Sequence, residues 1–110
     1  MSSAASRGDG GAGGQPALVE RTADGAIVLI RGSMVDALGR FMAITGGGLG
    51  TEANVAAMAG RFAGMGTERG LLLYKSGDAQ VKKLSSGKDA LAGAASGDWD
   101  EPCYLVMFRG

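Results

Sequence analysis

The sequence predicts an α+β fold in which a five-stranded antiparallel sheet carries helices on one face. Two short apolar runs near the start are separated by Asp24 and Gly25, the pair most typical of a tight β-hairpin. Apolar residues then recur at helical spacing over residues 51–66. Three further apolar runs follow this helix. The resulting order of strand, strand, helix region, strand, strand and strand favours antiparallel pairing over parallel βαβ units.

The chain divides into a tail over residues 1–15 and a single domain over residues 16–110. Glycine accounts for 21 of the 110 residues, and no large apolar side chain follows Met1 within the tail. A segment of this composition buries too little apolar surface to offset the entropy lost on ordering, so we expect it to be flexible. The rest of the chain is long enough to form one domain with its own core.

The first hairpin is expected to pair residues 17–22 with residues 26–31. The second of these runs is continuously apolar from Ala26 to Ile30, which predicts a central strand buried on both faces. A helix is predicted next, over residues 34–44, because five large apolar side chains fall on one helical face. They are Met34, Val35, Leu38, Phe41 and Met42.

The helix predicted over residues 51–66 has two apolar stripes. The first consists of large side chains, at Val55, Met58, Phe62 and Met65. The second consists of small residues spaced by four, namely Ala56, Gly60 and Gly64. An interior glycine costs a helix about 1 kcal/mol relative to alanine, and close approach by another helix compensates for that cost. We therefore expect the large stripe to pack on the sheet and the small stripe to form a helix interface. The alternative is a surface stripe without a partner.

The remaining strands are predicted at residues 71–75, 79–84 and 103–108. A turn over residues 76–78 joins the first two of them. A short helix or turn over residues 88–95 and a polar loop over residues 96–102 precede the last strand. The loop contains Trp99, the single tryptophan of the chain. Its side chain is expected either to fold onto the core or to serve as an interface anchor, a role for which tryptophan is enriched.

The composition excludes several kinds of catalytic site. The chain has no histidine and one cysteine, Cys103. Without imidazole there is no Ser-His-Asp or Cys-His nucleophile and no histidine metal ligand. A lone thiol cannot form an internal disulfide or a thiolate metal site. Eleven basic residues balance eleven acidic ones, which disfavours nucleic acid as the main partner. We expect no catalytic residue, no cofactor and no metal.

The glycine-rich run from Gly46 to Thr51 is the candidate nucleotide site. It precedes a predicted helix, where free N–H groups and the helix dipole favour anions. A Walker loop requires Gly-Lys-Ser/Thr, and no lysine stands in this run. Glu52, just inside the helix, would also repel phosphate. We interpret the run as a linker between helices and keep nucleotide binding as an alternative.

The expected location is the cytoplasm. The most hydrophobic stretch, residues 26–30, is far shorter than the about 20 residues needed to span a bilayer, so no membrane insertion is expected. The tail lacks the apolar centre of a secretory signal. Its serines and Arg7 are also compatible with a short organelle transit peptide.

The order of elements resembles that of the roadblock (dynein light chain) family. Residues 18–31, with Asp24 and Gly25 at the turn, are similar to the first hairpin of that family. Residues 51–69 resemble its long amphipathic helix. The runs that are similar in character to its inner strands are residues 71–74 and 104–107. Related profilin-like and longin-like sheets have a similar order.

The resemblance implies a non-enzymatic protein that forms homo- or heterodimers by pairing an edge strand and packing its long helices together. Such dimers act as scaffolds in motor complexes or in complexes that regulate small GTPases. We therefore expect a dimerising scaffold subunit with protein partners, which uses helix 51–66 and an edge strand. The alternatives are a small accessory structural subunit of a large assembly, or a nucleotide-binding protein that uses the glycine-rich run.

Overall fold

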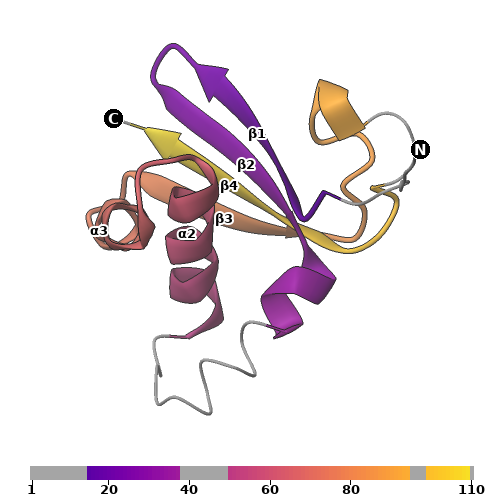
Figure 1. Cartoon of the computed structure of the whole chain (residues 1–110), viewed down its shortest axis with the longest axis horizontal. Helices are drawn as coiled ribbons and strands as arrows, with labels where there is room; N and C mark the ends of the chain where they lie inside the picture. The colour runs from indigo at the N-terminus through magenta and orange to yellow at the C-terminus, as the bar shows by residue number, and fades with distance from the viewer. Residues whose placement is uncertain (1–14, 38–49, 95–98, 110) are drawn as a thin grey trace, which may run out of the picture.

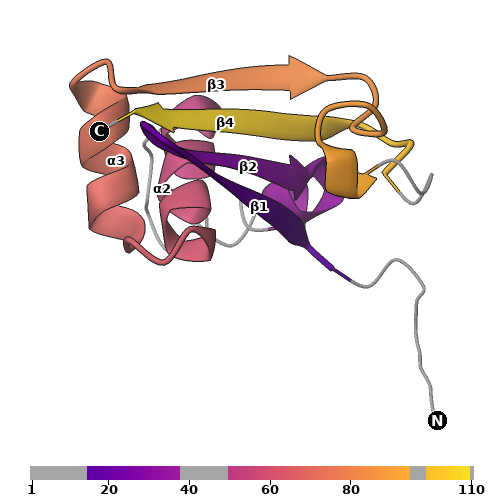
Figure 2. The same ribbon diagram turned by 90° about the horizontal axis from the view of Figure 1, so that it is seen from above.

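The computed structural model of the chain describes residues 15–37, 50–94 and 99–109. Within them an antiparallel sheet has the strand order β1-β2-β4-β3, and residues 32–37 are helical. Figures 1 and 2 show β1 and β3 as the outer strands of this sheet. The elements in chain order are β1 (Ala17–Thr22), β2 (Gly25–Arg31), α2 (Thr51–Phe62), α3 (Thr67–Lys75), β3 (Ala79–Leu84), the 3-10 turn η1 (Ala92–Ala94) and β4 (Cys103–Arg109).

The prediction of five strands is wrong, because the described residues form four. Residues 71–75, predicted as a strand, are the second half of helix α3. A short apolar run is compatible with either a strand or a helix, and here the residues that precede it favour the helix. Gly66 has a φ of 97° and separates the two helices. Glu68 then stabilises the first turn of α3, because a negative charge is favourable at a helix N-terminus. Leu72 is 66% exposed, whereas Leu73 packs against the core.

The first hairpin and the last strand are confirmed, but the turn residues differ from those predicted. Thr22 pairs with Gly25, so Ala23 and Asp24 form the two-residue turn and Gly25 begins β2. Gly25 is also required by the neighbouring strand, because a Cβ atom there would collide with the Phe108 carbonyl group of β4. The first predicted helix is described only over its beginning, since residues 38–49 lie outside the described residues, as do residues 1–14 of the predicted tail.

The last part of the connection between β2 and β3, residues 51–75, is a helical hairpin. Both strands pair antiparallel with β4, so they are parallel to each other with β4 between them. Helices α2 and α3 lead from one to the other and lie on the same side of the sheet (Figure 1). The result is a split βαβ unit extended by the edge strand β1.

The core is divided between the two faces of the sheet. On the helix face, alternate residues of the central strands pack against α2 and α3, among them Val28, Ile30 and Val106. On the opposite face, Leu29 and Cys103 pack against residues that precede β4, namely Leu91, Ala94 and Trp99. The prediction that β2 is buried on both faces therefore holds only for part of its length, because Ile27 on the second face is half-buried.

Candidate functional site

The candidate site is the part of the second sheet face that no described segment covers. Strand register brings four side chains into one row across this face, Glu20, Ile27, Met107 and Gln80. The next row contains Leu18, Leu29, Leu105 and Lys82. We call the uncovered residues of these two rows the open face: Glu20, Ile27, Gln80, Lys82, Leu105 and Met107.

The other end of this face is covered by residues 85–94 and 99–101, which we call the covering segment and which Arg31 fixes to the sheet. The Arg31 guanidinium carbon lies 3.9 Å from the centroid of the Trp99 ring. Its Nη1 donates to Glu101 Oε2 at 2.9 Å, and its Nε donates to the Gln15 carbonyl oxygen at 2.7 Å. Trp99 is 3% exposed, so this tryptophan packs inside the chain and is not accessible to a partner while the segment is in place.

The covering segment ends before the open face begins. Leu29 beneath it is fully buried, whereas Ile27, Leu105 and Met107 are only half-buried. Glu20 is exposed on the β1 side of this apolar centre, and Lys82 is exposed on the β3 side. The open face thus has an apolar centre, an acidic edge and a basic edge.

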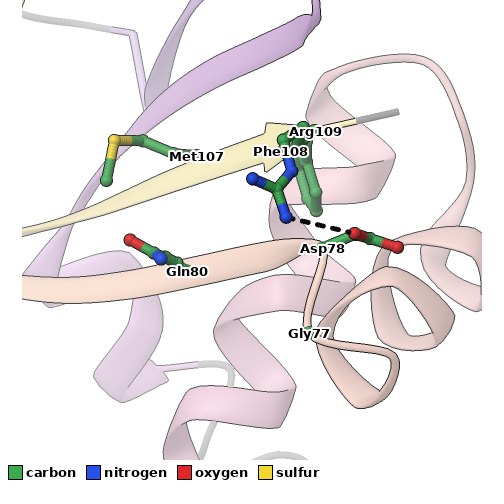
Figure 3. A pocket seen from close by; sticks show the side chains of 6 residues that line it. All are labelled: Gly77, Asp78, Gln80, Met107, Phe108 and Arg109. Carbon is green, nitrogen blue, oxygen red and sulfur yellow. Dashed lines mark ion pairs between the residues drawn. The ribbon is translucent and has the colours of Figure 1, made fainter.

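A shallow pocket of about 200 Å³ lies at the end of the open face, between the last residues of β4 and the start of β3. Figure 3 shows Met107 and Gln80 extending to the same side of the two strands, beside Asp78 and Arg109. Arg109 Nη2 lies 3.8 Å from Asp78 Oδ1, and both side chains are well exposed, so this ion pair contributes at most about 1 kcal/mol. Pockets that bind cofactors measure about 300–1,000 Å³. The pocket beside Met107 is smaller and has room for one side chain.

A second pocket, of about 430 Å³, lies where residues 32–36 meet β3 and β4. Cys103 is its one thiol, and it is fully buried with Sγ donating to the Glu101 carbonyl oxygen at 3.3 Å. Burial raises the pKa of this thiol, and the negative charge of Glu101 raises it further, while Arg31 opposes the shift. The thiol is therefore protonated at neutral pH and is a poor nucleophile.

The small stripe predicted as an interface lies against α3 of the same chain. Ala56 and Gly60 are buried, and a Cβ atom on Gly60 would lie 2.5 Å from the Gly66 carbonyl oxygen and 2.7 Å from the Gly70 Cα atom. Gly64 follows the helix with a φ of 83° and lies near Arg21, which donates to the Ala63 carbonyl oxygen. The close approach that compensates for Gly60 thus comes from within the chain.

The glycine-rich run from Gly46 to Thr51 lies mostly outside the described residues. Its last residue, Thr51, begins α2 after Gly50 in the N-cap position. Glu52 follows in the first turn and accepts a hydrogen bond from the Tyr74 hydroxyl at 2.9 Å. In the described part of the chain no group of three or more acidic or cysteine side chains is arranged to hold a metal ion.

The open face was not predicted from the sequence, although one signal for it is present. The β3 strand alternates between Ala79 and Val81 on the helix face and the polar side chains Gln80 and Lys82 on the other. Such alternation indicates a strand with one solvated face. The central parts of β2 and β4 concealed this signal, because residues 26–30 and 105–108 contain no polar side chain that distinguishes their two faces.

Fold and site together describe a small split βαβ domain with a partly uncovered sheet face. Comparison with models of protein families, with curated proteins and with solved structures gave no match. None of the helices in residues 15–37, 50–94 and 99–109 is long and apolar enough to cross a membrane.

Proposed function

We propose that this chain is a protein-binding scaffold subunit without catalytic chemistry of its own, and that the open face is its contact surface. The observation that carries the proposal is the half-buried apolar centre of Ile27, Leu105 and Met107 between charged edges. Protein interfaces commonly have an apolar centre surrounded by a polar rim. The pocket beside Met107 offers room for one side chain of a partner.

The chemistry of the described side chains also supports binding over catalysis. The Cys103 thiol is buried and protonated, and Glu101 is engaged with Arg31. General acid–base catalysis needs a titratable group that reaches the substrate with a pKa near the working pH. These two groups instead hold the covering segment against the sheet.

The expected use of helix 51–66 in dimerisation needs a different surface of that helix, because α3 already covers Ala56 and Gly60. The edge strands β1 and β3 both end the sheet in the described chain, so pairing through an edge strand stays a prediction. The resemblance to roadblock proteins also stays a prediction, together with the motor or small-GTPase complexes that it implies. The cytoplasmic location also stays a prediction.

Site-specific photocrosslinking tests the proposed surface. A photoreactive amino acid replaces Gln80 or Lys82 on the open face, and Leu72 on α3 serves as the control, because all three side chains are exposed. In intact cells of the source organism, we expect the two open-face positions to form discrete protein adducts and position 72 to form none. Equal adduct yields at all three positions, or none at the open face, would reject the proposed function.

A further inference from the structure

We propose that the pocket of about 430 Å³ beside residues 32–36 binds a small zwitterion, a molecule that carries an ammonium and a carboxylate on a short carbon chain. The volume lies within the range of about 300–1,000 Å³ found for small-molecule sites. The pocket is separate from the open face, because Tyr104 in its lining packs on the helix side of the sheet. A ligand here is additional to the protein partner proposed above.

One wall of the pocket is the helical segment over residues 32–37. Ser33 and Asp36 are three positions apart, so their side chains lie on the same side of this segment, and both line the pocket. Met34 and Val35 pack against the core instead. The helical wall therefore presents a hydroxyl and a carboxylate to the pocket.

A second wall is formed where β3 ends and β4 begins. Lys83 and Tyr104 are directly opposite each other in the antiparallel register, so the ammonium and the phenol lie on the same face of the sheet. Within residues 15–37, 50–94 and 99–109, neither Lys83 nor Asp36 forms an ion pair. Both side chains are exposed, so a ligand can reach both charges.

The third charged group of the lining, Glu101, is paired within the chain and helps to hold the walls together. Its Oε2 accepts a hydrogen bond from Arg31 Nη1 at 2.9 Å. The Gly32 N–H donates to the Pro102 carbonyl oxygen at 2.8 Å. These contacts fix the start of the helical segment against the residues that precede β4. A site whose walls are already in place loses less entropy when a ligand binds.

The charge balance of the pocket favours a zwitterion over ions of one sign. With Glu101 paired to Arg31, one carboxylate and one ammonium remain, at Asp36 and Lys83. A phosphate group would be repelled by Asp36, and a divalent cation or a polyamine would be repelled by Lys83. A zwitterion places its carboxylate at Lys83 and its ammonium at Asp36, and its carbon chain lies between the two walls.

Titration of the full, isotopically labelled chain with γ-aminobutyrate tests the site by NMR. Butyrate and butylamine have the same number of carbons and carry one charge each, so they are matched controls. We expect saturable shifts of the Ser33, Lys83 and Tyr104 amides and a dissociation constant of about 1 mM. Each singly charged compound should bind about tenfold more weakly, because one charge-assisted hydrogen bond is missing. Glycine and ε-aminocaproate, titrated in the same way, measure the charge separation that the pocket prefers.

Two variants assign each charge of the ligand to its partner. Asp36→Asn and Lys83→Gln should each weaken the binding of γ-aminobutyrate about tenfold. Lys83→Gln should also abolish the preference for γ-aminobutyrate over butylamine, and Asp36→Asn should abolish the preference over butyrate. Lys82→Gln is the control, because residue 82 is exposed on the other face of the sheet, and it should bind as the wild type does. Unchanged amide shifts away from the pocket show that each variant is folded.

The titrations can overturn the assignment in three ways. The first is a lack of saturable shifts with every zwitterion up to about 10 mM, well above the expected constant. The second is equal affinity for γ-aminobutyrate, butyrate and butylamine. The third is wild-type affinity in both charge variants. The photocrosslinks at positions 80 and 82 report on the open face alone, so the failure of this site and the failure of the proposed function are distinguishable.

Discussion

Gly60 of α2 and Gly70 of α3 meet backbone to backbone, with no space for a side chain on either. A Cβ atom on Gly60 would lie 2.7 Å from the Gly70 Cα atom, and one on Gly70 would lie 2.9 Å from the Gly60 Cα atom. Real Cβ atoms do not approach this closely, so any larger residue must separate the helices. The hairpin that connects β2 to β3 therefore depends on two glycines that are ten residues apart in the sequence.

We expect Gly70→Ala to destabilise the protein by about 2–3 kcal/mol, because overpacking shifts the two backbones apart. Helix propensity alone predicts the opposite, since alanine is favoured over glycine by about 1 kcal/mol within a helix. Urea unfolding measures the difference. Arg69→Ala, at the exposed neighbouring position, is the matched control and should change stability by less than about 0.5 kcal/mol. A stabilised Gly70→Ala variant would contradict the packing described here.

The contact between Arg31 and Trp99 can be followed through the fluorescence of the single tryptophan. We expect Arg31→Leu to destabilise the protein by about 1–3 kcal/mol, because the ring loses its cation and Glu101 loses its charge-assisted hydrogen bond. Trp99 should become more exposed as the covering segment detaches, which shifts its emission to longer wavelength. Arg61→Leu removes an exposed arginine of α2 and serves as the control. An unchanged emission spectrum in Arg31→Leu would show that other contacts suffice to hold the segment.

The buried Cys103 thiol predicts a loss of stability at alkaline pH. Burial and the nearby Glu101 charge raise its pKa in the folded state, so the unfolded chain releases the proton at a lower pH than the folded chain does. Stability is then retained below the ordinary thiol pKa of about 8.5 and falls as the pH rises above it. Urea unfolding at several pH values between about 7.5 and 9.5 measures this slope.

Cys103→Ala provides the control for this slope. The variant should be less stable at pH 7 because it leaves a cavity, yet its stability should change less over the same pH range. The pKa of Tyr74 is also raised, first by its hydrogen bond to Glu52, but tyrosine titrates above the chosen range. Parallel pH profiles for the wild type and Cys103→Ala would disprove the role of the thiol.

Local signals in the sequence were sufficient to predict the elements that depend on neighbouring residues. Asp24 and Gly25 located the first hairpin, and the β1 boundaries agree with those predicted, residues 17–22. Ala56 and Gly60 pack on a second helix and Val55 and Met58 join the core on the sheet, as predicted for two stripes of one helix, but α2 ends at Phe62, so Gly64 lies beyond it. That the second helix would come from the same chain was not predicted, because residues 71–75 were expected to be a strand.

The open face depends on information that is not local. Whether Ile27 is covered depends on how far the covering segment reaches across the sheet, and Arg31 fixes that segment from a distant part of the chain. The contact between Arg31 and Trp99 joins residues 68 positions apart, and no spacing rule predicts it. Sequence patterns thus predicted the four described strands of the sheet, but not how much of the sheet face other segments cover.

The central position of β4 has a kinetic consequence. In the order of synthesis β4 follows the three other strands, yet it is the strand that joins β3 to the hairpin of β1 and β2. A nascent chain that ends before residue 103 therefore has no pairing partner for β3, and both β2 and β3 expose unpaired edges. Pairings between distant segments form slowly, and unpaired edges favour aggregation, so productive folding must await the release of β4 from the ribosome.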